Sequence, residues 1–202
     1  MTCAMKLALA LTGLGCALSL ACDLGRVDQG RAVAYDKETG VITVVQEACG
    51  TAAPGCAGTA PQYALPAVQI KVPRNPNEMG PAPETGRLLL LDTQQRQAVL
   101  FDPASASLRT VAYRPLHDES GVFGDDPRVA KTAFPAIDRE KKTITLYFVH
   151  ERRLITFTVA DDLLALPDAA WKTGDEVRYY YKQPGQALRL MNVTKTDVRK
   201  GG

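Results

Sequence analysis

Residues 34–45 read Ala-Tyr-Asp-Lys-Glu-Thr-Gly-Val-Ile-Thr-Val-Val, and this stretch decides the fold that we expect for the chain. Runs rich in β-branched and aromatic residues on both sides of the polar segment predict two strands, 30–35 and 41–45. Asp36 and Gly40 bound the segment between them, and both residue types favour a reversal of the chain. The stretch is therefore expected to form a β-hairpin.

A near copy of this hairpin lies in the second half of the chain. Residues 136–147 read Ala-Ile-Asp-Arg-Glu-Lys-Lys-Thr-Ile-Thr-Leu-Tyr, so that Ala, Asp, Glu, Ile and Thr coincide when the two stretches are superposed. Further pairs of similar segments follow in the same order: 69–72 with 156–159, 84–86 with 172–174, 87–91 with 176–181, and 97–101 with 186–190. We interpret this order as a tandem duplication of a five-strand unit; independent convergence of hairpin sequences is the alternative.

The duplication predicts a mainly β fold with a first β unit at 30–114, an acidic linker at 115–130 and a second β unit at 131–200. Five strands with a linking segment after the third are the outline of an oligonucleotide/oligosaccharide-binding (OB) barrel. Residues 160–166 read as a short helix, whereas the four prolines of 73–83 predict an exposed loop. We expect a tandem pair of small OB-like barrels, and a single β-sandwich of all strands is the alternative.

The N-terminus carries the pattern of an export signal. Lys6 is followed by the uncharged, apolar or small residues 7–21, a run shorter than the roughly 20 residues of a membrane span. Cys22, directly after Leu-Ala, resembles the lipobox cysteine of bacterial lipoproteins, which carries a diacylglyceryl group. We expect a signal peptide at 1–21, a lipid on Cys22 and a tether at 22–29; cleavage that leaves a soluble secreted protein is the alternative.

The other cysteines fit a location outside the cytoplasm. Cys16 lies inside the expected signal and competes with Cys22 as a lipidation site. Cys49 and Cys56 remain as a pair, with a Pro-Gly sequence between them that lets the chain turn back. We expect a structural disulfide between them, because their spacing is not that of a Cys-x-x-Cys redox site.

Two stretches resemble an uncharacterised lipoprotein family of sulfate-reducing bacteria. They are 29–37, Gln-Gly-Arg-Ala-Val-Ala-Tyr-Asp-Lys, and 174–182, Gly-Asp-Glu-Val-Arg-Tyr-Tyr-Tyr-Lys. With the Pro184-Gly185 turn that follows it, the second stretch also looks like small exported β-barrels of bacteria. The resemblance implies an exported lipoprotein and assigns no chemistry to it.

In lipoproteins of the enteric type, an aspartate after the acylated cysteine favours the inner over the outer membrane, and Asp23 occupies that position.

The sequence indicates no catalytic or cofactor site. It contains neither a Gly-x-Ser-x-Gly elbow nor a glycine-rich phosphate loop, and it has two histidines. We therefore expect no enzyme activity and no cofactor. The net charge of +2 falls to +1 when Lys6 leaves with the signal, which argues against a nucleic-acid partner.

Two groups of side chains are the remaining binding candidates. The segment 117–127 carries four carboxylates, Asp118, Glu119, Asp125 and Asp126. Oxygen ligands suit calcium, but the spacing is not that of an EF-hand, so we expect a solvated linker and no metal site. The alternation of 177–182 places three side chains on one face, next to a cation of the facing strand: Arg178, Tyr180, Lys182 and Arg189. This face would stack a base or a sugar; an ordinary sheet edge is the alternative.

Taken together, these patterns predict a location and a broad class of function. We expect a lipoprotein that is anchored on the periplasmic side of a membrane and acts as a non-catalytic binding or assembly module for an envelope protein partner. The alternative is a receptor for a small ligand or a metal ion. The specific partner or ligand is not indicated by any motif.

Overall fold

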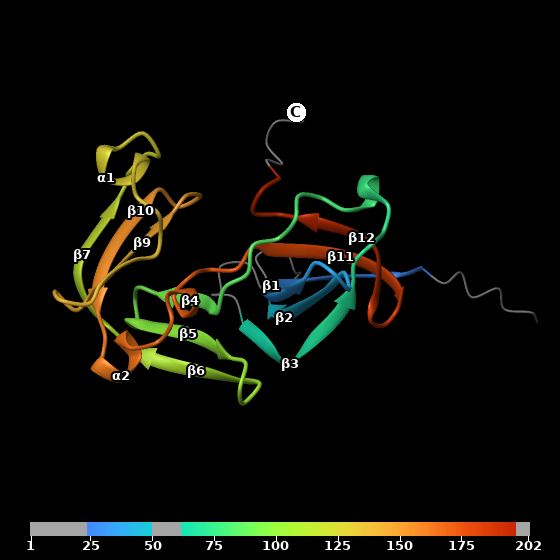
Figure 1. Cartoon of the computed structure of the whole chain (residues 1–202), viewed down its shortest axis with the longest axis horizontal. Coiled ribbons are helices and arrows are strands. Elements are labelled where there is room, and N and C mark those ends of the chain that lie inside the picture. Colours follow the sequence, from blue (N-terminus) through green and yellow to red (C-terminus); the bar gives the residue numbers. More distant parts are fainter. Residues whose placement is uncertain (1–23, 50–61, 197–202) are drawn as a thin grey trace, which may run out of the picture.

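The computed structural model describes residues 24–49 and 62–196 (Figure 1). The chain is mainly β, as expected. Its strands are β1 (Arg26–Asp36), β2 (Val41–Cys49), β3 (Gln62–Lys71), β4 (Leu88–Asp92), β5 (Gln97–Asp102), β6 (Ser107–Ala112), β7 (Arg114–Ser120), β8 (Ala136–Asp138), β9 (Thr143–Phe148), β10 (Arg153–Thr158), β11 (Glu176–Gln183) and β12 (Gln186–Asn192). Four single helical turns accompany them: η1 (Pro76–Glu78), α1 (Pro127–Ala130), α2 (Asp161–Leu164) and η2 (Asp168–Ala170).

Both predicted hairpins form, and their turns have the same construction. The backbone N–H of Thr39 donates to Asp36 at 3.2 Å, and that of the equivalent residue Lys141 donates to Asp138 at 2.8 Å. Each turn ends on a residue with positive φ: Gly40 at 67° and Lys142 at 55°. The predicted equivalence of 34–45 and 136–147 is therefore visible in the backbone as well as in the sequence.

Strands from the two ends of the chain share one sheet. Its five strands follow the order β1-β11-β12-β3-β2 and close into a barrel. β1 pairs with β11 from Arg26↔Tyr181 to Arg31↔Glu176, in antiparallel register. The closing contact between β12 and β3 is a single parallel pair, Gln186↔Lys71.

The expectation of two successive barrels is wrong, because the two predicted units exchange strands. The barrel combines the first three strands of unit 30–114 with the last two strands of unit 131–200. Reciprocally, β8, β9 and β10 share their core with β4, β5 and β6 (Figure 1). The segment 115–130 is not a linker, since β7 pairs along β10 from Arg114↔Thr158 to Ser120↔Arg153. Within residues 24–49 and 62–196, the strands form one closed barrel and two open sheets.

Residues at corresponding positions of the two predicted copies are buried in the two different cores. Ile42 and Val44 lie in the barrel core, whereas their counterparts Ile144 and Leu146 lie in the second core. Ile70 and Phe157 are a third such pair, and Ala187 and Ala98 are a fourth. This is what a duplication followed by an exchange of strands predicts.

The sheet β4-β5-β6 lies between the barrel and the sheet β7-β10-β9-β8. The run of leucines in β4 explains this position, because a strand that is buried on both faces needs apolar residues at successive positions. Leu88 faces the second core, and Leu89 packs against Val45 on the outer wall of the barrel. The sheets β4-β5-β6 and β7-β10-β9-β8 therefore face each other across the second core, as in a sandwich.

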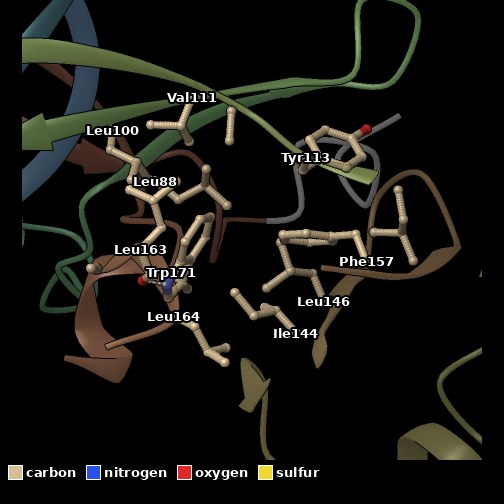
Figure 2. Packing of buried hydrophobic residues seen from close by; sticks show 13 residues of the cluster. Leu88, Leu100, Val111, Tyr113, Ile144, Leu146, Phe157, Leu163, Leu164 and Trp171 are labelled. Carbon is tan, nitrogen blue, oxygen red and sulfur yellow. Dashed lines mark hydrogen bonds between the residues drawn. The ribbon is translucent and has the colours of Figure 1, made fainter. Parts of the chain in front are cut away.

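Trp171 fills the centre of the second core (Figure 2). Its side chain is fully buried, its ring meets Phe157 edge-on with 5.8 Å between the centroids, and its Nε1 donates to the carbonyl oxygen of Leu163 in α2 at 3.4 Å. The predicted helix at 160–166 is thus a single turn that closes one side of this core. Burial in this core explains why a tryptophan is present at position 171.

The segments 84–86 and 172–174, which both end in Thr-Gly, cross next to β1. The exchange of strands between the two copies takes place at this crossing. The N–H of Ala32 donates to the carbonyl oxygen of Asp175 at 2.9 Å, and the N–H of Gly86 donates to that of Ala32 at 3.2 Å. Gly174 lies so close to Ala32 and Gly86 that a Cβ atom at this position would overlap their backbone atoms. Glycine is required here for the close approach of three chain segments.

We predict that Gly174→Ala lowers the free energy of unfolding by about 1–3 kcal/mol or more, because the new methyl group forces the crossing apart. Urea unfolding followed by circular dichroism measures this loss. Gly124→Ala is the matched control, since no heavy atom lies within 4 Å of its Cβ position, and it should change the stability by less than about 0.5 kcal/mol. Equal stabilities for the two variants would contradict the assigned role of the crossing.

Candidate functional site

The barrel has an open mouth at the end where β1 begins and β11 turns into β12. A cavity of about 370 Å³ lies there. Pro184 and Gly185 form the turn at its rim, and Gly185 has a φ of 79°, as a type II turn requires. Val68 and Ile70 of β3 form its apolar wall. The mouth thus joins a polar rim to the apolar interior of the barrel.

Four polar side chains form one hydrogen-bond network inside the mouth. Gln46 Nε2 donates to Asp28 Oδ2 at 2.9 Å and to the hydroxyl oxygen of Tyr179 at 2.8 Å. The hydroxyl group of Tyr181 donates to the same Oδ2 atom of Asp28 at 2.8 Å. The rings of Tyr179 and Tyr181 lie 5.7 Å apart between centroids. β1, β2 and β11 are therefore tied together at this point by side chains as well as by their backbones.

Both tyrosines of the mouth are held in the protonated form. Burial raises the pKa of Tyr179, and donation to the Asp28 carboxylate raises the pKa of Tyr181. The mouth consequently presents the neutral hydroxyl groups, the Gln46 amide and the Asp28 carboxylate, and Arg26 and Gln186 also line it. Since charges of both signs are present, the arrangement suits a small neutral or zwitterionic molecule better than a strongly charged one.

The predicted ligand face on β11 is only partly available. Tyr180 lies opposite Arg189 in the register, as the alternation predicts. However, Arg178 donates to Gln29 at 2.6 Å and Arg189 forms an ion pair with Glu78 at 2.7 Å, so both guanidinium groups are engaged. Lys182 is exposed at the end of the strand.

The functional surface that the alternation pattern missed is the opposite face of the same strand. On this face, Tyr179 and Tyr181 pack in the interior of the barrel. The sequence does not show that β1 lies beside β11. This pairing brings Asp28 to Tyr181 and so creates the polar network. The polar residues at the inward positions Asp28 and Gln46 were the signal available in the sequence.

Three of the four carboxylates considered for a metal site are paired with arginine side chains. Asp118 forms an ion pair with Arg153 at 2.6 Å, and the Arg128 guanidinium binds both Glu119 and Asp126 at 2.7 Å. These hydrogen bonds lower the pKa of Glu119 and of Asp126 to about 2. Asp125 is exposed. Within 24–49 and 62–196, no three His, Cys, Asp or Glu side chains form a group able to hold a metal ion.

A second polar cluster lies on the outer wall of the barrel. Arg31 of β1 lies 4.0 Å from Glu47 of β2 and 3.7 Å from Glu176 of β11. Burial and the neighbouring Glu176 carboxylate raise the pKa of Glu47. Because each residue belongs to a different strand, we interpret the cluster as a polar tie between the three strands.

Three predicted sites fall where the structure gives no side-chain information. Cys22 and Cys56 lie outside the described residues, and Cys49 is described only as the last backbone position of β2. The lipid attachment and the disulfide therefore stay predictions. Among the described residues, no helix is both long enough and apolar enough to cross a membrane.

A family model described as "Domain of unknown function (DUF4881)" matches residues 23–201. The chain belongs to this family. No curated protein matches the chain significantly, and neither does any solved structure. The barrel mouth and the interlocked cores are thus features of a DUF4881 domain.

We predict that Asp28→Asn lowers the pKa of Tyr181 toward the ordinary value of 10.0, because the negative charge next to its hydroxyl group is removed. Ultraviolet absorbance titration of the tyrosines measures this change, and subtraction of the Tyr181→Phe titration assigns it. Asp168→Asn is the control, since it removes an exposed carboxylate that pairs with Arg139. If the titrations of Asp28→Asn and the wild type coincide, the mouth network is wrongly assigned.

Proposed function

We propose that this protein is an exported lipoprotein that acts as a non-catalytic binding module, with the mouth of its barrel as the ligand site. The observation that carries the proposal is the network of Asp28, Gln46, Tyr179 and Tyr181 inside an open cavity. Polar groups that converge in a concave, partly apolar site are typical of ligand pockets. Small five-stranded barrels of the OB-like class also bind ligands.

The place where the chain enters the barrel supports the proposed anchor. Leu24 is 85% exposed at the start of the described residues, and β1 begins two residues later. The family match begins at residue 23, directly after Cys22. We propose a signal peptide at 1–21, a lipid on Cys22, a disulfide between Cys49 and Cys56, and the periplasmic face of the inner membrane as the location.

The opposite end of the molecule favours a second function, assembly with an envelope protein. Phe123 and Val149 are both more than half exposed, and the guanidinium group of Arg152 lies 4.5 Å from the ring centroid of Phe123. These residues flank α1 and the β9–β10 turn, in the sheet that lies on the other side of β4-β5-β6 from the barrel (Figure 1). Apolar side chains beside a cation suit a protein surface better than a small molecule.

We predict that the native protein carries acyl groups on Cys22 and that Cys22→Ser moves it from the membrane fraction to the soluble fraction. The physical reason is that the acyl chains supply the apolar contact with the bilayer. Mass spectrometry of the mature N-terminus and cell fractionation measure this. Cys16→Ser is the matched control and should leave the protein in the membrane fraction. A mature N-terminus without acyl mass would refute the anchor.

We predict that neutral sugars or zwitterionic amino acids perturb the backbone NMR signals of the mouth. Gln46→Leu should abolish the perturbation, because it removes the two donated hydrogen bonds that hold Asp28 and Tyr179 in place. Gln94→Leu alters an exposed turn and serves as the control. The ligand site is disproved if neither class of compound shifts the signals of the mouth in the wild-type protein.

A further inference from the structure

The barrel end that holds the mouth also carries apolar side chains on its outer surface. Val27 is 59% exposed and Leu188 is 44% exposed. Tyr180 lies opposite Val27 in the register, and Leu188 is the extra residue of a bulge that follows the pair Tyr180↔Arg189. The ring of Tyr180 lies against Gly25. The first residues of the described chain therefore run over this apolar surface.

Three cations surround the same end of the barrel. Arg26 follows Gly25, Lys182 ends the exposed face of β11, and the N–H of Lys71 donates to the carbonyl oxygen of Gly185 in the β11–β12 turn at 2.8 Å. Within 24–49 and 62–196, no salt bridge engages these three cations, whereas Arg189 is paired with Glu78.

Asp28 turns into the mouth and binds Gln46 and Tyr181. Asp23 is the opposing charge that the sequence places beside the anchor.

The short chain between Cys22 and the barrel indicates which partner covers this apolar surface. Leu24 follows Cys22 by two positions in the chain, a step that spans at most about 7 Å. A lipid on Cys22 would therefore hold Leu24 and the neighbouring surface at the level of the lipid headgroups. Tyrosine and aliphatic side chains beside cations are the composition that favours an anionic membrane surface.

From these contacts we infer that the anchor end, defined by Leu24, Val27, Tyr180 and Leu188 with the cations Arg26, Lys71 and Lys182, docks onto anionic phospholipid. This inference rests on the proposed lipid anchor and extends it. The anchor supplies the attachment, and the anchor end orients the barrel so that its mouth opens toward the headgroup region. The sheet β7-β10-β9-β8 then lies on the side of the molecule away from the membrane (Figure 1).

The test uses the acylated full-length protein in vesicles of phosphatidylcholine, with or without phosphatidylglycerol. A water-soluble amine-acylating reagent labels exposed lysines, and mass spectrometry measures the labelling of each site. We expect labelling of Lys182 and Lys71 to fall roughly fivefold or more when phosphatidylglycerol is present, and to recover at high salt. Lys131 at the end of α1 is exposed and should be labelled equally in both vesicles.

Charge reversal tests the same docking without removing the anchor. Arg26→Glu should restore labelling of Lys182 in anionic vesicles while the protein still floats with them, and Lys131→Glu should change neither property. Equal labelling of Lys182 in the two vesicle types would overturn the docking, as would protection that depends on protein concentration and not on lipid, since a second copy then covers the surface. Protein that fails to float would overturn the anchor and the docking together, so flotation separates the two failures.

Discussion

The antiparallel pairing of β1 with β11 is the interaction on which the rest of the structure depends. It joins residue 26 to residue 181, and without it the sheet β1-β2-β3 has two open edges and an uncovered apolar face. The pairing closes the barrel and places β4 against its outer wall, because the Gly86 and Gly174 segments must cross beside Ala32. Each core consequently depends on strands of both predicted copies, so that the two cores are expected to unfold together.

The same pairing creates the candidate site. Asp28 comes from β1, Gln46 from β2 and the two tyrosines from β11, so the network exists only when both ends of the chain are in register. A shift of one residue in β11 would turn Tyr179 and Tyr181 to the outer surface. The buried positions Val177 and Tyr179 resist such a shift, because it would expose them. Packing of the barrel core thus fixes the geometry of the mouth.

Much of the local structure could be predicted from the sequence, whereas the pairing of distant strands could not. Alternation and turn residues identified both hairpins, the strands at 87–91 and 97–101, and the turn at Pro184-Gly185. Each copy also contains enough strands for a barrel of its own, and local patterns do not distinguish pairing within a copy from pairing between copies. β7 was missed because its acidic residues resemble a solvated loop, although Asp118 is neutralised by Arg153 across the sheet. The face of Tyr180 was chosen over that of Tyr181 because the sequence does not show that β1 lies beside β11.

The exchange of strands also affects the order in which the fold becomes complete as the chain is synthesised. The end with Cys22 is synthesised first, yet β1 must wait for β11 and β12, the last of which ends at Asn192 in a chain of 202 residues. Contacts of such high sequence separation form slowly, and open strand edges invite pairing with other chains in the meantime. A chain that stops before β11 would contain the first three strands but no finished mouth. The mouth can therefore form only after β11 and β12 have been made, although β1, which supplies Asp28, comes first in the described chain.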